Sequence, residues 1–366
     1  MSFELHENVP LAPLTTFGVG GNARWLAPIR SEEDLLEALN WASSRSIPVF
    51  VLGGGSNLLV DDEGFPGLVL HMQITGIEPR SADLFNVGAG VLWDDFVSRV
   101  VSAGYAGVEC LAGIPGSVGG TPVQNVGAYG QEVSEVIESV RAYDREQGTF
   151  VWLSAADCHF RYRESRFNIE EPSRFLVTRV TFRLQPNGQP NLRYADLRRH
   201  FGLDGSTAET PLPTVQQVAA AVREIRRSKG MLLVAGDPDV RSAGSFFKNA
   251  IVDAALLPQI AAAVGLDTAA VPNWPAGPGL LKLPAAWLLE RAGFVKGFGA
   301  GPVGISTKHT LAVVNRGHAT FADVAAFQQE ITAAVQARFG VTLIREPVTM
   351  QVVEDRQSSV DGVSTL

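Results

Sequence analysis

Three consecutive glycines between two apolar runs constrain this chain more than any other feature of its sequence. The run at 47–52 predicts a buried strand, and the sequence GGGSN at 53–57 follows directly, before a second apolar run at 58–60. Glycine lets the backbone adopt positive φ and approach a ligand without an intervening Cβ. Consecutive N–H groups in such a turn can bind one anion, for which a diphosphate is the natural candidate. These residues alone leave open a plain tight turn between two buried strands.

The bulk composition argues against several function classes. The 366 residues allow two or three domains, and 46% hydrophobic with 19% charged residues is typical of a globular enzyme. A net charge of −8 argues against nucleic-acid or anionic-membrane binding. The cysteines, Cys110 and Cys158, form no CxxC pattern, so we expect no metal site. Without a signal peptide pattern or a long apolar run, we expect a cytoplasmic protein.

Periodicity and capping signals predict a mixture of helices and strands. Helices are expected at 31–43, 93–101, 214–227, 284–292 and 320–338. Strands are expected at 47–52, 68–72, 136–143, 149–153, 175–184 and 341–353. Residues 185–213, rich in Pro, Gly and Asn, are expected to form a linker. No GxGxxG sequence opens a helix directly after a strand, so the pattern is not that of a Rossmann fold.

Eight short motifs stand in a fixed order between residues 11 and 350. They are TFGVGG at 16–21, GGGSN at 53–57, GIPGSVGG at 113–120, QNVGAYG at 124–130, YRESRF at 162–167, AGSFFKN at 243–249, AWLLE at 286–290 and HTL at 309–311. Together they resemble the UDP-N-acetylenolpyruvoylglucosamine reductase family, flavoenzymes of peptidoglycan precursor synthesis. A chance match of all eight in order is very improbable.

The resemblance implies an α+β fold. It implies an FAD-binding region of the vanillyl-alcohol-oxidase type, with subdomains expected at 1–75 and 76–200, and a C-terminal α+β substrate-binding domain at 201–354. The polar tail at 355–366 is expected to be disordered. The sequence NLRYADL at 191–197 resembles the tyrosine loop of one of the family's two types, in which Tyr194 would swing over the bound substrate.

The resemblance also implies an activity, cofactors and partners. The family uses FAD and the co-substrate NADPH to reduce UDP-N-acetylglucosamine enolpyruvate to UDP-N-acetylmuramate, for cell wall biogenesis and hence cell shape and division. Many flavoproteins of this fold type attach flavin through a histidine in the glycine turn; none stands here, so we expect non-covalent FAD. The expected partner is the small-molecule substrate, with no nucleic acid and no membrane, and the expected state is a monomer.

The cofactor is expected to lie on the glycine turn and on two further glycine-rich segments, through main-chain groups. The alternative is that these segments are plain irregular loops. That alternative does not easily explain the eight glycines from Gly104 to Gly130. The expected cofactor-binding residues are Gly53, Gly54, Gly55, Ser56, Asn57, Ile114, Pro115, Gly116, Gly119, Gly120, Gln124, Asn125, Gly127 and Ala128.

Three residues are expected to carry the chemistry by correspondence with the family. Arg163 would bind the enolpyruvyl carboxylate through its two-pronged guanidinium; its alternative is a surface ion pair with Glu164 or Glu170. Ser245 would donate the proton; its alternative is a helix or turn cap. Glu346 would act as a protonated or hydrogen-bonded acid of raised pKa, although alone it reads as an exposed strand residue.

Three further residues are expected at the substrate. Lys229 would contact the diphosphate with Tyr194 and Asn249 beside it, and its alternative is a solvated lysine in the last turn of a helix. At the C-terminus the family commonly has LEPEV, whereas this chain has Leu343 followed by IREP at 344–347. The proline directly after Glu346 has no N–H to donate to a strand. The backbone at Glu346 could therefore be tilted from its usual path in the family.

Two rival functions remain open at this point. A flavin oxidase of the same fold, acting on an alcohol or sugar with O2, would not need the pair Ser245 and Glu346. A non-catalytic nucleotide-binding module would purify without a flavin spectrum. Anaerobic reduction by NADPH followed by re-oxidation with the sugar nucleotide would separate the three.

Overall fold

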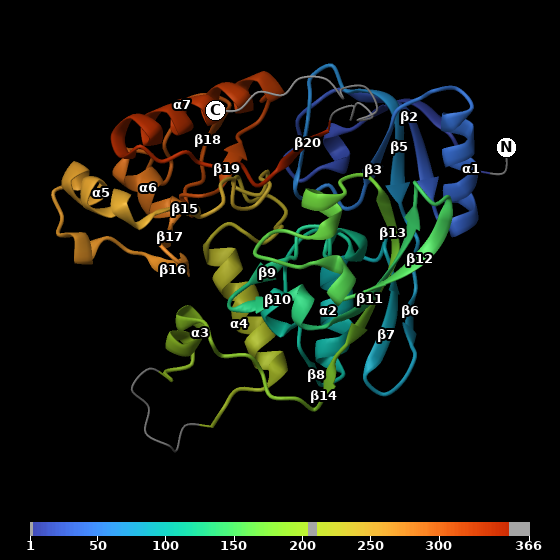
Figure 1. The fold of residues 1–366 in the computed structure, drawn as a ribbon, viewed down its shortest axis with the longest axis horizontal. Coiled ribbons are helices and arrows are strands. Elements are labelled where there is room, and N and C mark those ends of the chain that lie inside the picture. The colour runs from blue at the N-terminus through green and yellow to red at the C-terminus, as the bar shows by residue number, and fades with distance from the viewer. Residues whose placement is uncertain (1–2, 204–210, 351–366) are drawn as a thin grey trace.

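The structure, a computed structural model, describes residues 3–203 and 211–350 and contains three regions (Figure 1). The first region is a four-stranded sheet in the order β1-β2-β5-β3, covered by helix α1. Strands β2, β5 and β3 are parallel, and β1 runs antiparallel to β2. The bounds are β1 (His6–Pro10), β2 (Asn22–Ile29), α1 (Glu32–Ser43), β3 (Val49–Leu52) and β5 (Phe65–Met72).

Helix α1 begins where its sequence predicts. The Asp34 N–H donates to Ser31 Oγ at 3.0 Å, and the Ser31 N–H donates to Asp34 Oδ2 at 3.0 Å. This reciprocal capping satisfies two amide groups that a helix start otherwise leaves unpaired. Leu35, Ala38 and Ala42 then face the sheet and are buried.

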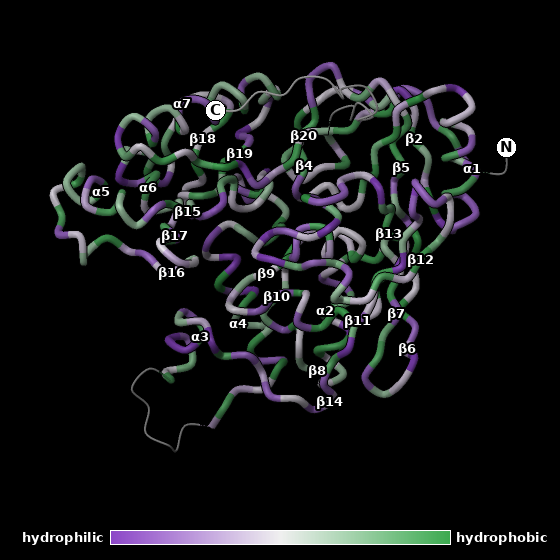
Figure 2. Tube along the Cα trace, viewed as in Figure 1, coloured by the Kyte–Doolittle hydropathy of each residue, from purple (hydrophilic) through white to green (hydrophobic). Residues whose placement is uncertain are grey.

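The second region is a five-stranded antiparallel sheet in the order β12-β11-β13-β7-β6. Helix α2 packs on it, with Trp93 and Phe96 lying 5.8 and 4.9 Å from the ring of Phe182. Hydrophobic residues follow β13 in Figure 2, in agreement with its burial. The bounds are β6 (Ile77–Pro79), β7 (Leu84–Gly88), α2 (Trp93–Ser102), β11 (Ile137–Asp144), β12 (Thr149–Ser154) and β13 (Phe175–Arg183).

Short elements border this second region. Two-stranded pairs join β8 (Tyr105–Ala106) to β14 (Gln185–Pro186) and β9 (Gly127–Ala128) to β10 (Gln131–Glu132). Helix α4 (Val215–Ser228) packs against the second region, and α3 (Ala195–His200) packs on α4. Short helical turns lie at Glu109–Leu111, Val118–Gly120, Val133–Glu135, Ala156–Cys158 and Arg166–Glu170.

The C-terminal region holds a separate core between its helices and two small sheets. Phe246, Leu288, Ile331 and Phe339 are fully buried in it. One sheet has the order β15-β17-β16 and the other pairs β18 with β19. The bounds are β15 (Ala250–Asp253), α5 (Leu257–Val264), β16 (Trp274–Gly277), β17 (Leu280–Leu283), α6 (Ala285–Arg291), β18 (Val303–Ile305), β19 (Val313–Asn315) and α7 (Phe321–Phe339).

A strand pair and a helix cap are among the contacts that tie the C-terminal region to the first. Strand β20 (Val348–Met350) pairs in parallel with β4 (Leu58–Val60), which directly follows the glycine turn. The carboxylate of Asp62 accepts hydrogen bonds from the N–H groups of Phe321 and Ala322 at 2.7 and 3.0 Å, at the start of α7. In Figure 1 β20 accordingly lies beside the first region.

The structure corrects two predictions of secondary structure. The strand expected at 341–353 is reduced to Val348–Met350 among the described residues, and Pro347, which has no N–H, immediately precedes it. The linker expected at 185–213 contains β14 and α3. The tail at 355–366 lies outside the described residues, and the three domain boundaries stay a prediction.

Candidate active site

One cavity of approximately 1260 Å³ is lined by all three regions. It is long, and segments far apart in the sequence form its walls. Of the residues predicted for the site, those that line this cavity are Gly53, Gly54, Gly55, Ser56, Asn57, Ile114, Pro115, Gly116, Gly119, Gly120, Gln124, Gly127, Ala128, Arg163, Tyr194, Lys229, Ser245, Asn249 and Glu346. The structure therefore brings nearly the whole predicted set to one place.

The glycine turn at 53–57 packs directly against the backbone of the segment 113–120. A Cβ added to Gly54 would lie 2.6 Å from the Cα of Gly116 and 2.9 Å from the N of Ser117. Gly55 has a φ of +62°, and its Cβ would lie 2.0 Å from the carbonyl oxygen of Leu14. Both positions exclude any larger residue, because backbone atoms of other segments occupy the space.

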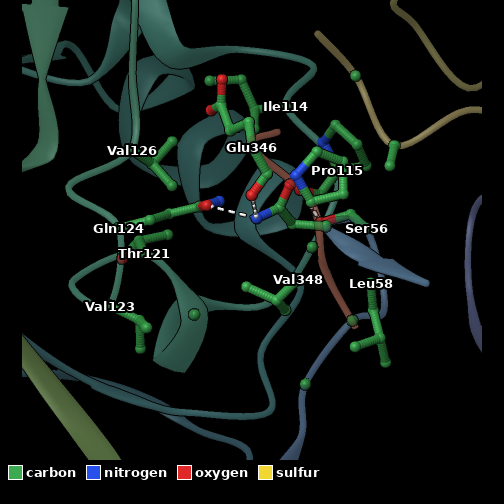
Figure 3. Close-up of a pocket in the computed structure, with 18 of the residues that line it drawn as sticks. Ser56, Leu58, Ile114, Pro115, Thr121, Val123, Gln124, Val126, Glu346 and Val348 are labelled. Atoms are coloured by element: carbon green, nitrogen blue, oxygen red, sulfur yellow. Dashed lines mark hydrogen bonds between the residues drawn. The ribbon is translucent and has the colours of Figure 1, made fainter. Parts of the chain in front are cut away.

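Side chains beside the turn fix it to its neighbours. Ser56 Oγ donates to the carbonyl of Pro115 at 3.0 Å. Asn57 Nδ2 donates to Gln124 Oε1 at 2.6 Å and to the carbonyl of Glu346 at 3.3 Å, as Figure 3 shows. The amide of Asn57 thus joins the glycine turn to both other walls of the cavity.

Ser117 stands out among the polar groups at this wall. Its side chain is buried, and Oγ has no hydrogen-bond partner in the described residues. The same Oγ would lie 2.7 Å from a Cβ on Gly53, so it borders the turn. A buried hydroxyl without a partner is costly, which indicates that a bound group completes this part of the site.

Asn125 is the one predicted cofactor-binding residue that does not line the cavity. Its side-chain amide donates to Glu132 Oε2 at 2.8 Å and to the carbonyl of Arg161 at 3.0 Å, and its Oδ1 accepts from the Ser134 N–H at 3.2 Å. Only 1% of the residue is exposed. These bonds show that the side chain of Asn125 holds the loop, and its expected main-chain contact with the cofactor stays a prediction.

Arg163 points its guanidinium into the cavity from a strained position. Its φ is +58°, which is uncommon for a residue with a side chain. Nη1 donates to the carbonyl of Asn125 at 3.3 Å and Nη2 donates to that of Gly127 at 2.6 Å. Nε lies 3.2 Å from Glu346 Oε1 but makes no hydrogen bond of good geometry. Two carbonyls therefore aim the guanidinium at the carboxyl group of Glu346.

The alternative surface ion pairs of Arg163 do not form. Glu170 instead binds His159 Nδ1 at 2.6 Å and Arg161 Nη2 at 3.4 Å. The positive charge of Arg163 is thus available inside the cavity, where a low dielectric strengthens its attraction for a carboxylate.

Glu346 is half-buried and lies outside the strands, so it is not the exposed strand residue that it resembles in isolation. Its N–H donates to the carbonyl of Phe246 at 3.0 Å, and the Lys248 N–H donates to the carbonyl of Ile344 at 2.9 Å. These bonds place Glu346 beside the segment that carries Ser245. Burial raises the pKa of Glu346, and the charges of Arg163 and Lys248 oppose that shift only in part.

Pro347 does not displace this backbone from its neighbours. The next amide, that of Val348, donates to the carbonyl of Asn57 at 3.0 Å, and β20 begins there. The departure from the family pattern at this position therefore leaves Glu346 on the cavity wall.

Ser245 lines the cavity together with Arg163 and Glu346. It follows Gly244, whose φ is +74°, and precedes Phe246, whose N–H donates to the carbonyl of Leu311 at 2.8 Å. The described segment after it is not helical until the short helical turn at Ala254–Leu256, so Ser245 caps no helix. Its hydroxyl is half-buried at the cavity surface.

Lys229 and Tyr194 meet at one end of the cavity. Lys229 Nζ lies 2.9 Å from Asp196 Oδ2 and 5.7 Å from the ring centre of Tyr129. The rings of Tyr129 and Tyr194 lie 5.3 Å apart in an edge-to-face arrangement. Lys229 is half-buried and ion-paired, which differs from the solvated lysine of the alternative interpretation.

Asn249 also has a structural contact. Its Oδ1 accepts a hydrogen bond from the Ala285 N–H at 3.1 Å, at the first turn of α6. The side chain also hydrogen-bonds Tyr162, a cavity residue whose pKa is raised chiefly by burial. Asn249 therefore joins α6 to the wall that carries Arg163.

Several cavity residues escaped the prediction from sequence. Arg226 is 7% exposed; its Nε donates to the carbonyl of Gly113 at 3.1 Å and its Nη2 to that of Met231 at 2.7 Å. His309 has its pKa lowered to about 4, mainly by burial, so it is neutral at pH 7. Two features of the sequence could have predicted these residues. Arg226 precedes Lys229 by one helical turn, and His309 opens the HTL motif.

The described residues contain no group of three or more His, Cys, Asp or Glu side chains placed to hold a metal ion. Over the same residues, every helix is too short or too polar to cross a membrane.

Comparisons with known proteins match both halves of the chain. A model described as FAD binding domain matches residues 25–154. A second, described as UDP-N-acetylenolpyruvoylglucosamine reductase, C-terminal domain, matches residues 237–350. Their order along the chain is the order predicted from the motifs.

Similar proteins agree with these matches. The UDP-N-acetylenolpyruvoylglucosamine reductase of Streptomyces coelicolor is 48% identical over 357 residues, which cover 95% of this chain and 91% of that protein. The protein of the same name from Thermobifida fusca is 46% identical, with 96% and 99% covered. The crystal structure of the UDP-N-acetylenolpyruvylglucosamine reductase from Thermus caldophilus aligns with a TM-score of 0.64 at 27% identity, covering 96% of this chain and 100% of that chain.

Proposed function

Since this chain belongs to the UDP-N-acetylenolpyruvoylglucosamine reductase family, we propose that Arg163, Glu346 and Ser245 act together on its enolpyruvyl substrate. The protein is an FAD-containing oxidoreductase that reduces UDP-N-acetylglucosamine enolpyruvate to UDP-N-acetylmuramate, a peptidoglycan precursor. The predicted α+β fold, with an FAD-binding region followed by the family's C-terminal domain, is confirmed, and so is the reductase function over the oxidase alternative.

The residues of the cavity fit FAD. The glycine turn and the segment 113–120 form a wall that a Cβ at Gly54 would fill, and Ser117 Oγ beside it has no hydrogen-bond partner in the described chain. Main-chain groups of Gly53, Gly54 and Gly116 would hold the diphosphate, as consecutive N–H groups do for anions. When bound, FAD supplies the carrier that takes a hydride from the reductant and passes it to the substrate alkene.

Arg163 would bind the carboxylate of the enolpyruvyl group. Hydride addition to the terminal alkene carbon places negative charge on the adjacent carbon, from which it spreads into the carboxylate. A cation already fixed by two carbonyls stabilises this charge more as it grows, which lowers the barrier. Glu346, in its protonated form, would donate a hydrogen bond to the same carboxylate from the other side.

Ser245 would deliver the proton that completes the reduction. A serine hydroxyl is a weak acid, but the carbanion-like intermediate is basic enough to accept its proton when the geometry is fixed. The shared cavity of Ser245, Arg163 and Glu346, with the 3.2 Å approach of Arg163 to Glu346, is the observation that supports this division of roles.

Further parts of the assignment are our proposals from the family. NADPH would be the hydride donor and would alternate with the sugar nucleotide at non-covalently bound FAD. Lys229, Tyr194 and Asn249 would contact the substrate. The protein would act as a monomer in the cytoplasm and so support cell wall growth, cell shape and division.

Separate measurement of the two half-reactions tests the role of Ser245. In Ser245→Ala we expect NADPH to reduce the flavin at the wild-type rate, whereas re-oxidation by the enolpyruvyl substrate slows by about 10²- to 10⁴-fold, the usual contribution of a positioned acid. Stopped-flow absorbance of the flavin follows both steps. Ser245→Cys, which keeps an acidic hydrogen, should recover part of the second rate. Equal losses in both half-reactions would show that Ser245 is not the proton donor.

A further inference from the structure

The segment 191–200, here called the tyrosine strap, crosses one end of the cavity. At its start the Asn191 N–H donates to the buried Glu109 Oε1 at 2.7 Å, and Asn191 Nδ2 donates to the carbonyl of Gly130 at 3.0 Å. On its outer side Arg193 Nη2 lies 2.7 Å from Glu135 Oε2. These contacts hold the strap to the second region without involving the cavity.

A different kind of contact holds the strap at the cavity itself. Asp196, in the first turn of α3, places Oδ2 2.9 Å from the ammonium of Lys229 at the end of α4. The hydrogen bond from Lys229 is the main cause of a lowered pKa at Asp196, so this group is a carboxylate at neutral pH. Burial lowers the pKa of Lys229, but the hydrogen bond to Asp196 and the nearby negative charges outweigh burial and leave it raised.

The carboxylate of Asp196 therefore binds Lys229, the cation that is assigned to the substrate diphosphate. A diphosphate carries more negative charge than a single carboxylate and accepts hydrogen bonds at several oxygens, so it attracts an ammonium more strongly. The displaced carboxylate would keep a partner, because Asp196 Oδ1 also lies 3.2 Å from Arg199 Nη1. When the diphosphate replaces the Asp196 carboxylate at Lys229, each charged group therefore keeps a partner of opposite charge.

We propose that Asp196 occupies Lys229 in place of the substrate diphosphate and that diphosphate binding displaces it. This inference rests on the proposed contact between Lys229 and the diphosphate. Asp196 is then a positioning residue: it keeps Lys229 at the cavity end and ties the strap, with Tyr194, to α4. Displacement removes that tie, so binding of the diphosphate and movement of the strap become linked.

UDP and uridine are the probes that test this exchange, with binding measured by titration calorimetry on the FAD-loaded enzyme. In Asp196→Asn the competing charge is gone and the size is kept, so we expect the Kd for UDP to fall about two- to fivefold, the range of a partly exposed ion pair. The Kd for uridine, which has no phosphate, should not change. Glu135→Gln is the matched control, because it cuts the ion pair of the strap residue Arg193 and leaves Lys229 untouched.

Each outcome decides a separate question. A gain in UDP affinity for Asp196→Asn alone, absent in Glu135→Gln and abolished when Lys229→Met is added, is the expected result. An unchanged or weaker UDP affinity in Asp196→Asn, or an equal gain in Glu135→Gln, overturns the exchange. If Lys229→Met alone binds UDP as tightly as the wild type, the assignment of Lys229 to the diphosphate is wrong instead. The flavin absorbance spectrum of every variant verifies that the cavity is intact.

Discussion

At the scale of single residues, the protonation of Glu346 depends on two opposed effects. Burial raises its pKa, whereas the guanidinium of Arg163 and the ammonium of Lys248 lower it, and burial is the larger effect. An acid with a raised pKa is protonated over a wider pH range and can donate a hydrogen bond to a carboxylate that would otherwise repel it. The hydrogen bonds of Arg163 to two backbone carbonyls matter here, because they hold the guanidinium beside the carboxyl group of Glu346, with Nε 3.2 Å from Oε1.

The rate of flavin re-oxidation by substrate should therefore fall as pH rises through the raised pKa of Glu346, since the protonated fraction declines. Glu346→Gln keeps a neutral hydrogen-bond donor at every pH. We expect it to remove this pH dependence and to retain the rate of the enzyme with protonated Glu346 to within about tenfold, because the hydrogen-bond donor to the developing charge is kept. Single-turnover rates between pH 5 and pH 9 measure the effect. The exposed Glu330→Gln on α7 is the control, and an identical pH profile in both variants would contradict the role of Glu346.

The sequence alone identified the site residues that stand in distinctive motifs, but it did not reveal the contacts that these residues make. Arg163 and Ser245 stand in distinctive motifs and line the cavity as predicted. Asn125 stands in an equally distinctive motif, yet its side chain is used for loop bonds that no spacing reveals. The ion pair of Lys229 with Asp196 was equally hidden, because the two residues stand 33 positions apart in the sequence and no spacing rule relates them.

At the scale of elements, the glycine turn and the segment 113–120 work as one structure. Their backbones touch across Gly54 and Gly116, so neither segment can hold its shape alone. The buried Arg226 adds to this by binding the carbonyl of Gly113. Tight backbone packing and ligand binding are thus compatible at this turn. The absence of a Cβ on glycine allows both the close approach of another backbone segment and the approach of a ligand.

Gly54→Ala should break this contact, because its Cβ would lie 2.6 Å from the Cα of Gly116. We expect the purified protein to lose most of its bound FAD, with an apparent FAD affinity at least about tenfold weaker, corresponding to about 1.4 kcal/mol or more of strain and displaced backbone. The flavin-to-protein absorbance ratio and titration of the apoprotein with FAD measure this. Gly301→Ala has open space around its Cβ and should retain FAD. Full FAD content in Gly54→Ala would contradict the packing argument.

Helices with strong local signals were predicted well, and short elements were not. Capping boxes at Ser31, Thr214 and Thr320 mark the starts of α1, α4 and α7 as expected. Helix α3 has six residues and no side-chain cap, so it has no local signature, and it is held by tertiary contacts with α4. The sequence 341–353 reads as one long strand, but among its described residues a ladder forms only at Val348–Met350, where β4 offers a partner.

At the scale of the whole molecule, contacts of high sequence separation join the first and C-terminal regions: Phe17 and Leu59 are buried in the C-terminal core, and Asn315 Nδ2 donates to the carbonyl of Phe17. The carboxylate of Asp62 is one of them, since it caps the amide groups at the start of α7 from another region. A negative charge at that end also complements the helix dipole. These two effects give one exposed side chain a role in holding the regions together.

Asp62→Ala should lower the melting temperature by about 1–3 °C, the size expected for loss of a helix cap in a protein of this length. The flavin absorbance and the rate of flavin reduction should remain, because Asp62 does not line the cavity. Differential scanning calorimetry measures the change. Glu63→Ala, at the neighbouring exposed position, should have no effect; equal shifts in the two variants would argue against capping.

The arrangement of regions was the part least accessible from sequence. The boundary expected at residue 200 assigns α4 to the C-terminal domain, whereas Val215, Val218 and Val222 are buried in the same core as α2. Hydrophobic periodicity reports which face of a helix is buried, but not which surface buries it. The linker composition of 185–213 indicated a change of structure there. It did not show whether α4 would pack against the second region or the C-terminal region.

The pairing of β20 with β4 also has a consequence for biosynthesis. About 290 residues separate the two strands, so β4 leaves the ribosome long before β20. At about 5–20 residues per second, β4 waits some 15–60 s for its neighbour. Glu346 enters the cavity only through this same late segment. We therefore expect a chain that stops before Glu346, whether nascent or released early by the translation machinery, to be inert towards the enolpyruvyl sugar.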